Sequence, residues 1–202
     1  RTVLGLSPLY IVIGGFQYLE ASLSLRVEVA HGWEVYPVSM VMFTATLLAV
    51  LLVYIKEDTR EARKLVYGLV LANAGLSLVS MLISQHVQIP GSELPPGLTT
   101  GSLRSSAWVA LVGTALLPID VIGIILVYEF VSRYVRFTFG RAALALLAIV
   151  AVDNFLFTLS VQWGNPDLPR LMLSGLVGKS AAAVFYASAL TLYLRFFEPA
   201  AA

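Results

Sequence analysis

Residues 37–55 of the sequence read PVSMVMFTATLLAVLLVYI and contain no charged side chain. A helix needs about 20 predominantly apolar residues to cross the hydrocarbon core of a bilayer, and this stretch approaches that length. Working outward from it, six such segments are found: residues 3–23, 37–55, 65–87, 106–132, 142–163 and 171–194. They are too long for the strands of a membrane β-barrel, so the sequence predicts an all-α integral membrane protein, a six-helix bundle.

The composition of the whole chain agrees with this prediction and excludes other classes. Of its 202 residues, 58% are hydrophobic and 12% are charged, and the mean hydropathy is +0.85. Soluble domains carry about 25% charged residues, so a soluble enzyme and a disordered chain are both excluded. The absence of cysteine excludes disulfides and thiolate metal sites. A net charge of +1 gives no reason to expect a nucleic-acid partner.

The distribution of Lys and Arg predicts the orientation of the bundle. Connections on the cytoplasmic side of a membrane protein are enriched in these residues. Nine basic residues fall at one side of the predicted bundle: Arg1, Lys56, Arg60, Arg63, Lys64, Arg133, Arg136, Arg141 and Arg195. The other side has Arg26, Arg104 and Arg170. We therefore expect both termini in the cytoplasm and a multi-pass protein of the inner membrane.

The connections differ in character. Residues 56–64 (KEDTREARK) are short and charged, which predicts a tight cytoplasmic turn between two helices. Residues 89–105 (IPGSELPPGLTTGSLRS) are longer and rich in Pro, Gly, Ser and Thr, and are expected outside. This segment is either a lid over an outward-facing pocket or a plain linker.

One domain is expected over residues 1–198, with residues 199–202 as a tail. The first residue is Arg and no cleavable signal pattern is visible, because hydrophobicity continues through Leu23. The last span ends shortly before the end of the sequence. Two alternatives follow: a bare bundle, or the membrane part of a longer protein with a cytoplasmic domain.

Ionisable side chains inside the spans are the strongest functional signal, because a charge in lipid costs several kcal/mol. They are Glu20, Asp120, Glu129, Asp153 and Lys179. At 1.5 Å per helical residue, Lys179 lies about 12 Å below the outer start of its span and Asp153 lies about 15 Å below the end of its own. Similar depths on consecutive helices predict an Asp153–Lys179 ion pair. Glu129 falls on the opposite face from Asp120 and is expected to pair with Arg133 and Arg136.

Further polar and aromatic residues share the outer half of the bundle with these charges. The candidate ligand-binding residues are Gln17, Glu20, Asn73, Asp120, Asp153, Asn154, Gln162, Trp163 and Lys179. Carboxylates accept N–H groups, lysine and amides meet carbonyls, and aromatic rings stack, so the set suits a small, planar, polar ligand. The alternatives are a structural ion pair and a serine stripe (Ser77, Ser80 and Ser84) that only joins helices.

Catalysis, metals and cofactors are not expected. The chain has no cysteine nucleophile, and its acids are not in the paired spacing of intramembrane hydrolases. His31 and His86 are isolated at the outer boundaries of the spans, so the sequence contains no metal-ligand pattern.

Four segments resemble vitamin-uptake-transporter-like proteins, a group that includes queuosine precursor transporters and is similar to the S components of energy-coupling-factor importers. They are EARKLVYGLVLANAG (61–75), LPIDVIGIILVYEFVSR (117–133), VDNFLFTLSVQWG (152–164) and GLVGKSAAAVFYASALTLYLR (175–195). The resemblance covers most of residues 36–195. It implies an S-component-like six-helix bundle with an outward substrate pocket, and it points to Asp120, Asp153 and Lys179.

Two departures from that group favour a sensor over a transporter. The transporters resembled here tend to carry an acidic residue near position 51, which in this chain lies within the apolar run TLLAVLLVYI (46–55). S components use an AxxxA stripe on their first helix, and this chain has only Gly14 and Gly15 there. Relatives also occur as membrane input modules of histidine kinases or cyclic-dinucleotide enzymes.

The resulting hypothesis is a membrane sensor module that binds a nucleobase- or vitamin-like ligand from outside and moves its last helix. A transporter of such a compound is the alternative. The expected partners are this ligand, the lipid bilayer, a C-terminal cytoplasmic signalling domain and, as an open alternative, a second copy of the chain.

Overall fold

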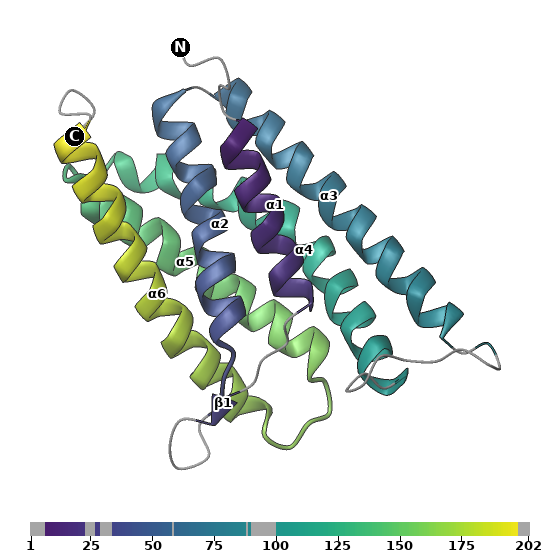
Figure 1. Cartoon of the computed structure of the whole chain (residues 1–202). Coiled ribbons are helices and arrows are strands. Elements are labelled where there is room, and N and C mark those ends of the chain that lie inside the picture. The colour runs from purple at the N-terminus through teal and green to yellow at the C-terminus, as the bar shows by residue number, and fades with distance from the viewer. Residues whose placement is uncertain are drawn as a thin grey trace.

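The computed structural model describes residues 7–22, 27–28, 34–57, 59–87, 89 and 100–197, and these form a helical bundle with one short hairpin (Figure 1). The helices are α1 (Ser7–Ser22), α2 (Pro37–Lys56), α3 (Thr59–His86), α4 (Thr100–Ser132), α5 (Thr138–Val161) and α6 (Leu168–Phe197). Between α1 and α2, strands β1 (Val27–Glu28) and β2 (Glu34–Val35) pair antiparallel, and β2 packs against α6. The all-α prediction is confirmed apart from this hairpin, whose two-residue strands are too short to produce a sequence period.

Five helices of the described chain are long and apolar enough to cross a membrane, so the protein is a membrane protein. These are α2, α3, α5, α6 and the Trp108–Ser132 part of α4. The first predicted span is seen only as the 16 residues of α1. The remaining residues of that span, 3–6 and 23, lie outside the described residues.

The helix order brings the basic connections to one end of the bundle. The α2–α3 and α4–α5 connections lie at the end where α1 begins and α6 finishes (Figure 1). The exposed side chains of Arg60, Arg63, Arg133 and Arg136 gather there. The tight turn predicted between the second and third spans is present, since α2 ends at Lys56 and α3 begins three residues later.

Helices α3 and α4 extend further than their apolar segments. The charged residues before position 65 form the first turns of α3, and residues 100–105 of the predicted outer loop belong to α4. Backbone groups near the membrane surface still need hydrogen bonds, and continuing the helix provides them. This shortens the predicted lid or linker, and its residues 90–99 lie outside the described residues.

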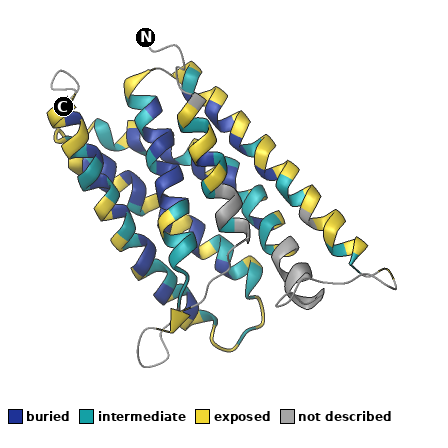
Figure 2. Cartoon of the chain, in the orientation of Figure 1, coloured by how far each residue is buried: buried dark blue, intermediate teal, exposed yellow. Residues whose placement is uncertain are grey.

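Helix α2 is the centre of the bundle and packs against each of the other five helices. Its residues Leu47, Val50 and Leu51 have no exposed surface. Helix α3 lies at the edge of the bundle, and much of its ribbon has the yellow of exposed residues in Figure 2. Its exposed residues include large apolar side chains such as Tyr67 and Leu71. Apolar residues at the edge of a membrane bundle face lipid, so exposure here is the expected state.

Candidate functional site

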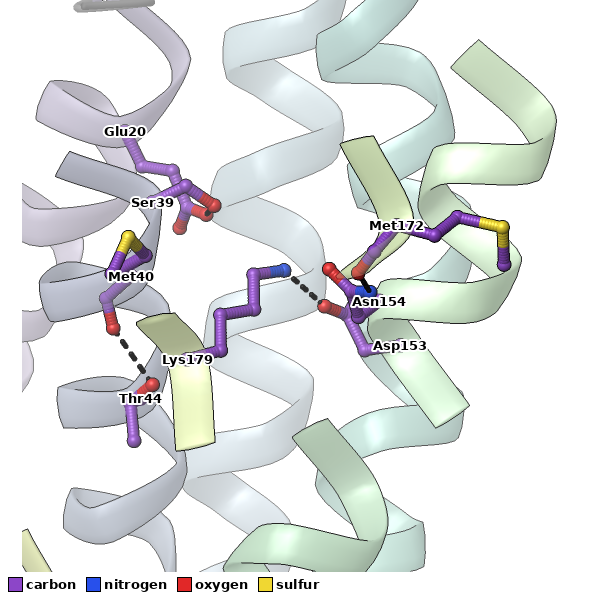
Figure 3. A network of polar contacts seen from close by, with 8 residues as sticks. All are labelled: Glu20, Ser39, Met40, Thr44, Asp153, Asn154, Met172 and Lys179. Atoms are coloured by element: carbon purple, nitrogen blue, oxygen red, sulfur yellow. Dashed lines mark hydrogen bonds and ion pairs between the residues drawn. The ribbon is translucent and has the colours of Figure 1, made fainter. Parts of the chain in front are cut away.

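A buried ion pair joins α5 to α6. The Nζ atom of Lys179 lies 2.5 Å from Oδ2 of Asp153, and the two side chains expose only 8% and 5% of their surfaces. Figure 3 shows the lysine extending from α6 to this carboxylate on the neighbouring α5. The predicted pair is thus confirmed, and the matching depths on two antiparallel helices explain it.

Two aromatic rings complete the surroundings of the lysine. Its Nζ lies 4.8 Å from the ring centroid of Phe43 on α2 and 5.6 Å from that of Phe157 on α5. A cation over a ring face is stabilised by the quadrupole of the ring, and this attraction strengthens where water is excluded. Lys179 is therefore held by α2 and α5 together, although it belongs to α6.

Close helix packing around this lysine depends on two glycines of α6. A Cβ atom on Gly178 would overlap the side chain of Met40 on α2, and one on Gly175 would overlap Oδ1 of Asn154 on α5. Asn154 in turn donates from Nδ2 to the carbonyl oxygen of Met172, at 2.8 Å. The candidate residue Asn154 therefore lies beside the ion pair and ties α5 to α6.

Glu20 brings α1 to the same region. The hydroxyl of Ser39 on α2 donates a hydrogen bond of 3.0 Å to Oε1 of Glu20 (Figure 3). The carboxyl of Glu20 lies close enough to Lys179 and Asp153 for their charges to interact. The prediction that acidic and basic groups from different helices converge is met at this position.

Asp120 adds a third carboxyl from α4. It is 2% exposed and lies within electrostatic range of Glu20, Asp153 and Lys179. Its Oδ2 atom is buried and has no hydrogen-bond partner in the described part of the protein. We refer to Glu20, Asp120, Asp153, Asn154 and Lys179 as the polar cluster; it draws on α1, α4, α5 and α6.

The remaining candidate residues are not seen in this cluster. Trp163 is 79% exposed in the α5–α6 connection, a position typical of tryptophan at a membrane surface. Gln162 accepts a 3.0 Å hydrogen bond from Asn165 in that same connection. Asn73 is buried and donates to the Leu69 carbonyl oxygen of its own helix. Gln17 lies in α1, but its side chain is outside the described residues.

The serine stripe of α3 joins helices at one position. The hydroxyl of Ser77 lies 2.7 Å from that of Thr114 on α4 and also bonds the Ala110 carbonyl oxygen. This agrees with the reading of the stripe as interhelical glue. Ser84 bonds within its own helix, and the side chain of Ser80 lies outside the described residues.

Four residues that pack around the polar cluster were not among the candidates from the sequence, three on α2 and one on α5. Ser39, Met40 and Phe43 lie in the uncharged stretch that identified a membrane span, and nothing in that stretch distinguishes one face from another. Phe157 could have been found, because it is four residues after Asp153 and so shares its helix face.

A second group of contacts lies near the C-terminal end of α6. Lys56 on α2 donates a 3.0 Å hydrogen bond to the hydroxyl of Tyr193 and lies 5.2 Å from its ring centroid. Tyr54 donates to Glu129 on α4 and packs edge-on against Tyr128. We call these five residues the terminal cluster. No ion pair joins Glu129 to Arg133 or Arg136 within the described chain, so the phenol of Tyr54 takes the place predicted for arginine.

The described residues contain no group of three His, Cys, Asp or Glu side chains arranged to hold a metal ion. The polar cluster itself provides hydrogen-bonding groups and charge. It offers carboxyl acceptors and one ammonium inside an apolar bundle, and the adjacent Phe43 and Phe157 add two ring faces.

The chain was compared with models of known protein families. A family model described as vitamin uptake-like sensor matches residues 1–194, so the chain belongs to the vitamin uptake-like sensor family. No curated protein and no solved structure matches the chain.

Proposed function

We propose that this protein is a membrane-embedded sensor module that binds a small polar ligand at the polar cluster and transmits binding through α6. The observation that carries the proposal is the position of Lys179. It belongs to α6, yet it is held by Asp153 and Phe157 of α5 and by Phe43 of α2. A ligand that competes for any of these contacts changes how α6 packs.

The route from this site to the end of the molecule is a single helix. Lys179 and Tyr193 are 14 residues apart in α6, or about 21 Å at 1.5 Å per residue. At its far end α6 is held by the exposed contacts between Lys56 and Tyr193. Exposed contacts of this kind contribute little stability, so a small shift of α6 can break them. Ligand binding then acts by shifting the population of two packing states.

The ligand class follows from the groups that are present. Two ring faces and several hydrogen-bonding groups favour a planar, polar molecule such as a nucleobase- or vitamin-like compound. The gathering of exposed arginines at the opposite end favours a cytoplasmic location for that end, with ligand entry from outside the inner membrane. A cytoplasmic output domain, such as a histidine kinase or cyclic-dinucleotide enzyme, would read α6; the membrane module itself performs no catalysis.

Spin-label distances test the movement of α6. The chain lacks cysteine, so Arg136→Cys with Arg195→Cys, both at exposed positions, gives a uniquely labelled pair across α4–α5 and α6. We expect a shift of about 1–2 Å, typical of signalling helices, when the small-molecule fraction released by heating the purified protein is added back. The matched pair Arg63→Cys with Arg136→Cys should not change. An unchanged α6 distance while that fraction binds would refute the sensor proposal.

A transporter is the second candidate, and the resemblance of residues 117–133, 152–164 and 175–195 to queuosine precursor transporters favours it. It would use the same polar cluster with alternating access. Leu51, at the position near which those transporters tend to carry an acid, is wholly buried among apolar side chains, which is why the sensor ranks first. Uptake of a radiolabelled 7-deazaguanine into proteoliposomes containing this chain alone would reverse that ranking.

A further inference from the structure

Asp120 is the one buried polar side chain of the described residues with an oxygen that lacks a hydrogen bond. It lies within α4, two residues after Pro118, and is 2% exposed. Buried carboxyl oxygens are nearly always paired, because an unpaired one loses its hydration without compensation. Such an oxygen in a membrane span therefore needs a reason.

Packing does not provide that reason. Asp153 is bonded by Lys179 and Glu20 is bonded by Ser39, so these two carboxyls connect helices. The unpaired oxygen of Asp120 connects nothing, and an apolar residue of the same size would fill its space without desolvating a polar group. The carboxyl of Asp120 is thus retained at a cost to stability.

The charges nearby define what this oxygen can accept. Glu20, Asp120 and Asp153 place three carboxyls within interaction range of one ammonium, that of Lys179. That ammonium is already bonded to Asp153 and flanked by two rings. A group that pairs with Asp120 must therefore come from outside the described protein. A cationic N–H donor suits this oxygen, because it supplies the missing hydrogen bond and its charge compensates the ionised carboxyl, which burial disfavours.

We propose that Asp120 selects the ligand by accepting a hydrogen bond from a planar, cationic N–H group, such as an amidinium or an aminated heterocycle in its protonated form. This deepens the proposed sensor function and rests on it. Asp120 is then a specificity-determining residue, whereas Asp153 and Lys179 hold the helices on which the ligand acts.

Benzamidine and benzamide provide the test, since they have the same planar shape and differ by an amidinium in place of an amide. Binding to the purified chain in detergent is measured by isothermal titration. We expect the wild type to bind benzamidine at least about tenfold more tightly than benzamide, as for hydrogen bonds to a charged group. Asp120→Asn, which replaces an acceptor oxygen by a donor, should abolish this preference. Glu129→Gln, the same change on the same helix but in the terminal cluster, should leave it intact.

A second variant shows whether a loss of ligand preference comes from the missing carboxyl or from a destabilised fold. Asp120→Leu should lose the preference for benzamidine while its Tm is equal to or higher than that of the wild type, because the unpaired carboxyl is removed. Equal affinities in the wild type, no binding of either probe, a preference that survives in Asp120→Asn, or a clearly lowered Tm of Asp120→Leu would each overturn the inference. A co-purified small molecule seen by native mass spectrometry on both wild type and Asp120→Asn would refute this inference and leave the sensor proposal standing.

Discussion

Helix α6 contacts the central helix α2 at two levels, through Lys179 of the polar cluster and through Tyr193 of the terminal cluster, and it does so by opposite means. At the first level, Lys179 is buried and held by a carboxylate and two rings. At the second, Tyr193 is bonded by Lys56 at an exposed position. Removing one partner from a buried pair is costly, whereas exposed polar contacts contribute little. Helix α6 is thus held firmly near its middle and loosely near its C-terminal end, as expected of a helix that moves at its output end.

The largest effect is expected from breaking the buried ion pair. Lys179→Met leaves Asp153 without its cation and should lower the free energy of unfolding by about 3–5 kcal/mol. Denaturant titration in detergent, followed by circular dichroism, measures it. The double variant Asp153→Asn with Lys179→Met removes both charges and should recover part of the loss. A single variant as stable as the wild type would show that the pair does not hold α5 to α6.

The next largest effect is expected from overfilling the contact beside that pair. Gly175→Ala places a methyl group on Oδ1 of Asn154 and should cost about 1–3 kcal/mol by displacing its bond to Met172. Thermal unfolding checks the loss. Gly68→Ala on α3, where a Cβ meets nothing within 4 Å, is the matched control and should not destabilise the protein. Equal behaviour of the two variants would contradict the close packing of α6.

A smaller effect is expected in the terminal cluster. Tyr54→Phe removes the hydroxyl that donates a hydrogen bond to Glu129 and should cost about 1 kcal/mol, the usual net contribution of one hydrogen bond. Its unfolding midpoint, compared with that of Tyr67→Phe at an exposed position on α3, measures this contribution. A loss as large as that of Lys179→Met would remove the contrast between the two levels.

The variant expected to change stability least, Lys56→Met, is also expected to change the resting position of α6 most. Lys56→Met removes the hydrogen bond and the cation–ring contact to Tyr193, which together are worth about 0.5 kcal/mol at an exposed site. The distance between labels at positions 136 and 195 should then equal, without added ligand, the distance expected in the wild type with ligand bound. If that distance stays as in the wild type, the terminal cluster is not the contact that holds α6 in its resting position.

The sequence predicted the ion pair because depth along a helix is simple arithmetic, and Asp153 and Lys179 lie on consecutive antiparallel helices. It also predicted that charged turns separate apolar spans. It could not predict that α2 is central, since both α2 and α3 are apolar and lipid accepts the same side chains as a core does.

Because the sequence does not show which helix faces meet, it also failed to predict several contacts at the site. Phe43 has no distinguishing neighbour in the sequence, so its contact with Lys179 depended on knowing which face of α2 meets α6. Charge alone predicted an arginine partner for Glu129, whereas the position of α2 brings Tyr54 to it instead. Trp163 follows Asp153 by ten residues, which carries it to the exposed end of the bundle.

The central claim is that the polar cluster binds a small molecule and is more than a structural ion pair. Native mass spectrometry of the full chain, purified from its own membranes in mild detergent, tests it most directly. We predict a non-covalent small-molecule adduct on the folded wild type that is absent from folded Asp153→Asn. A wild type that carries no adduct, or an adduct retained equally by Asp153→Asn, would contradict the claim.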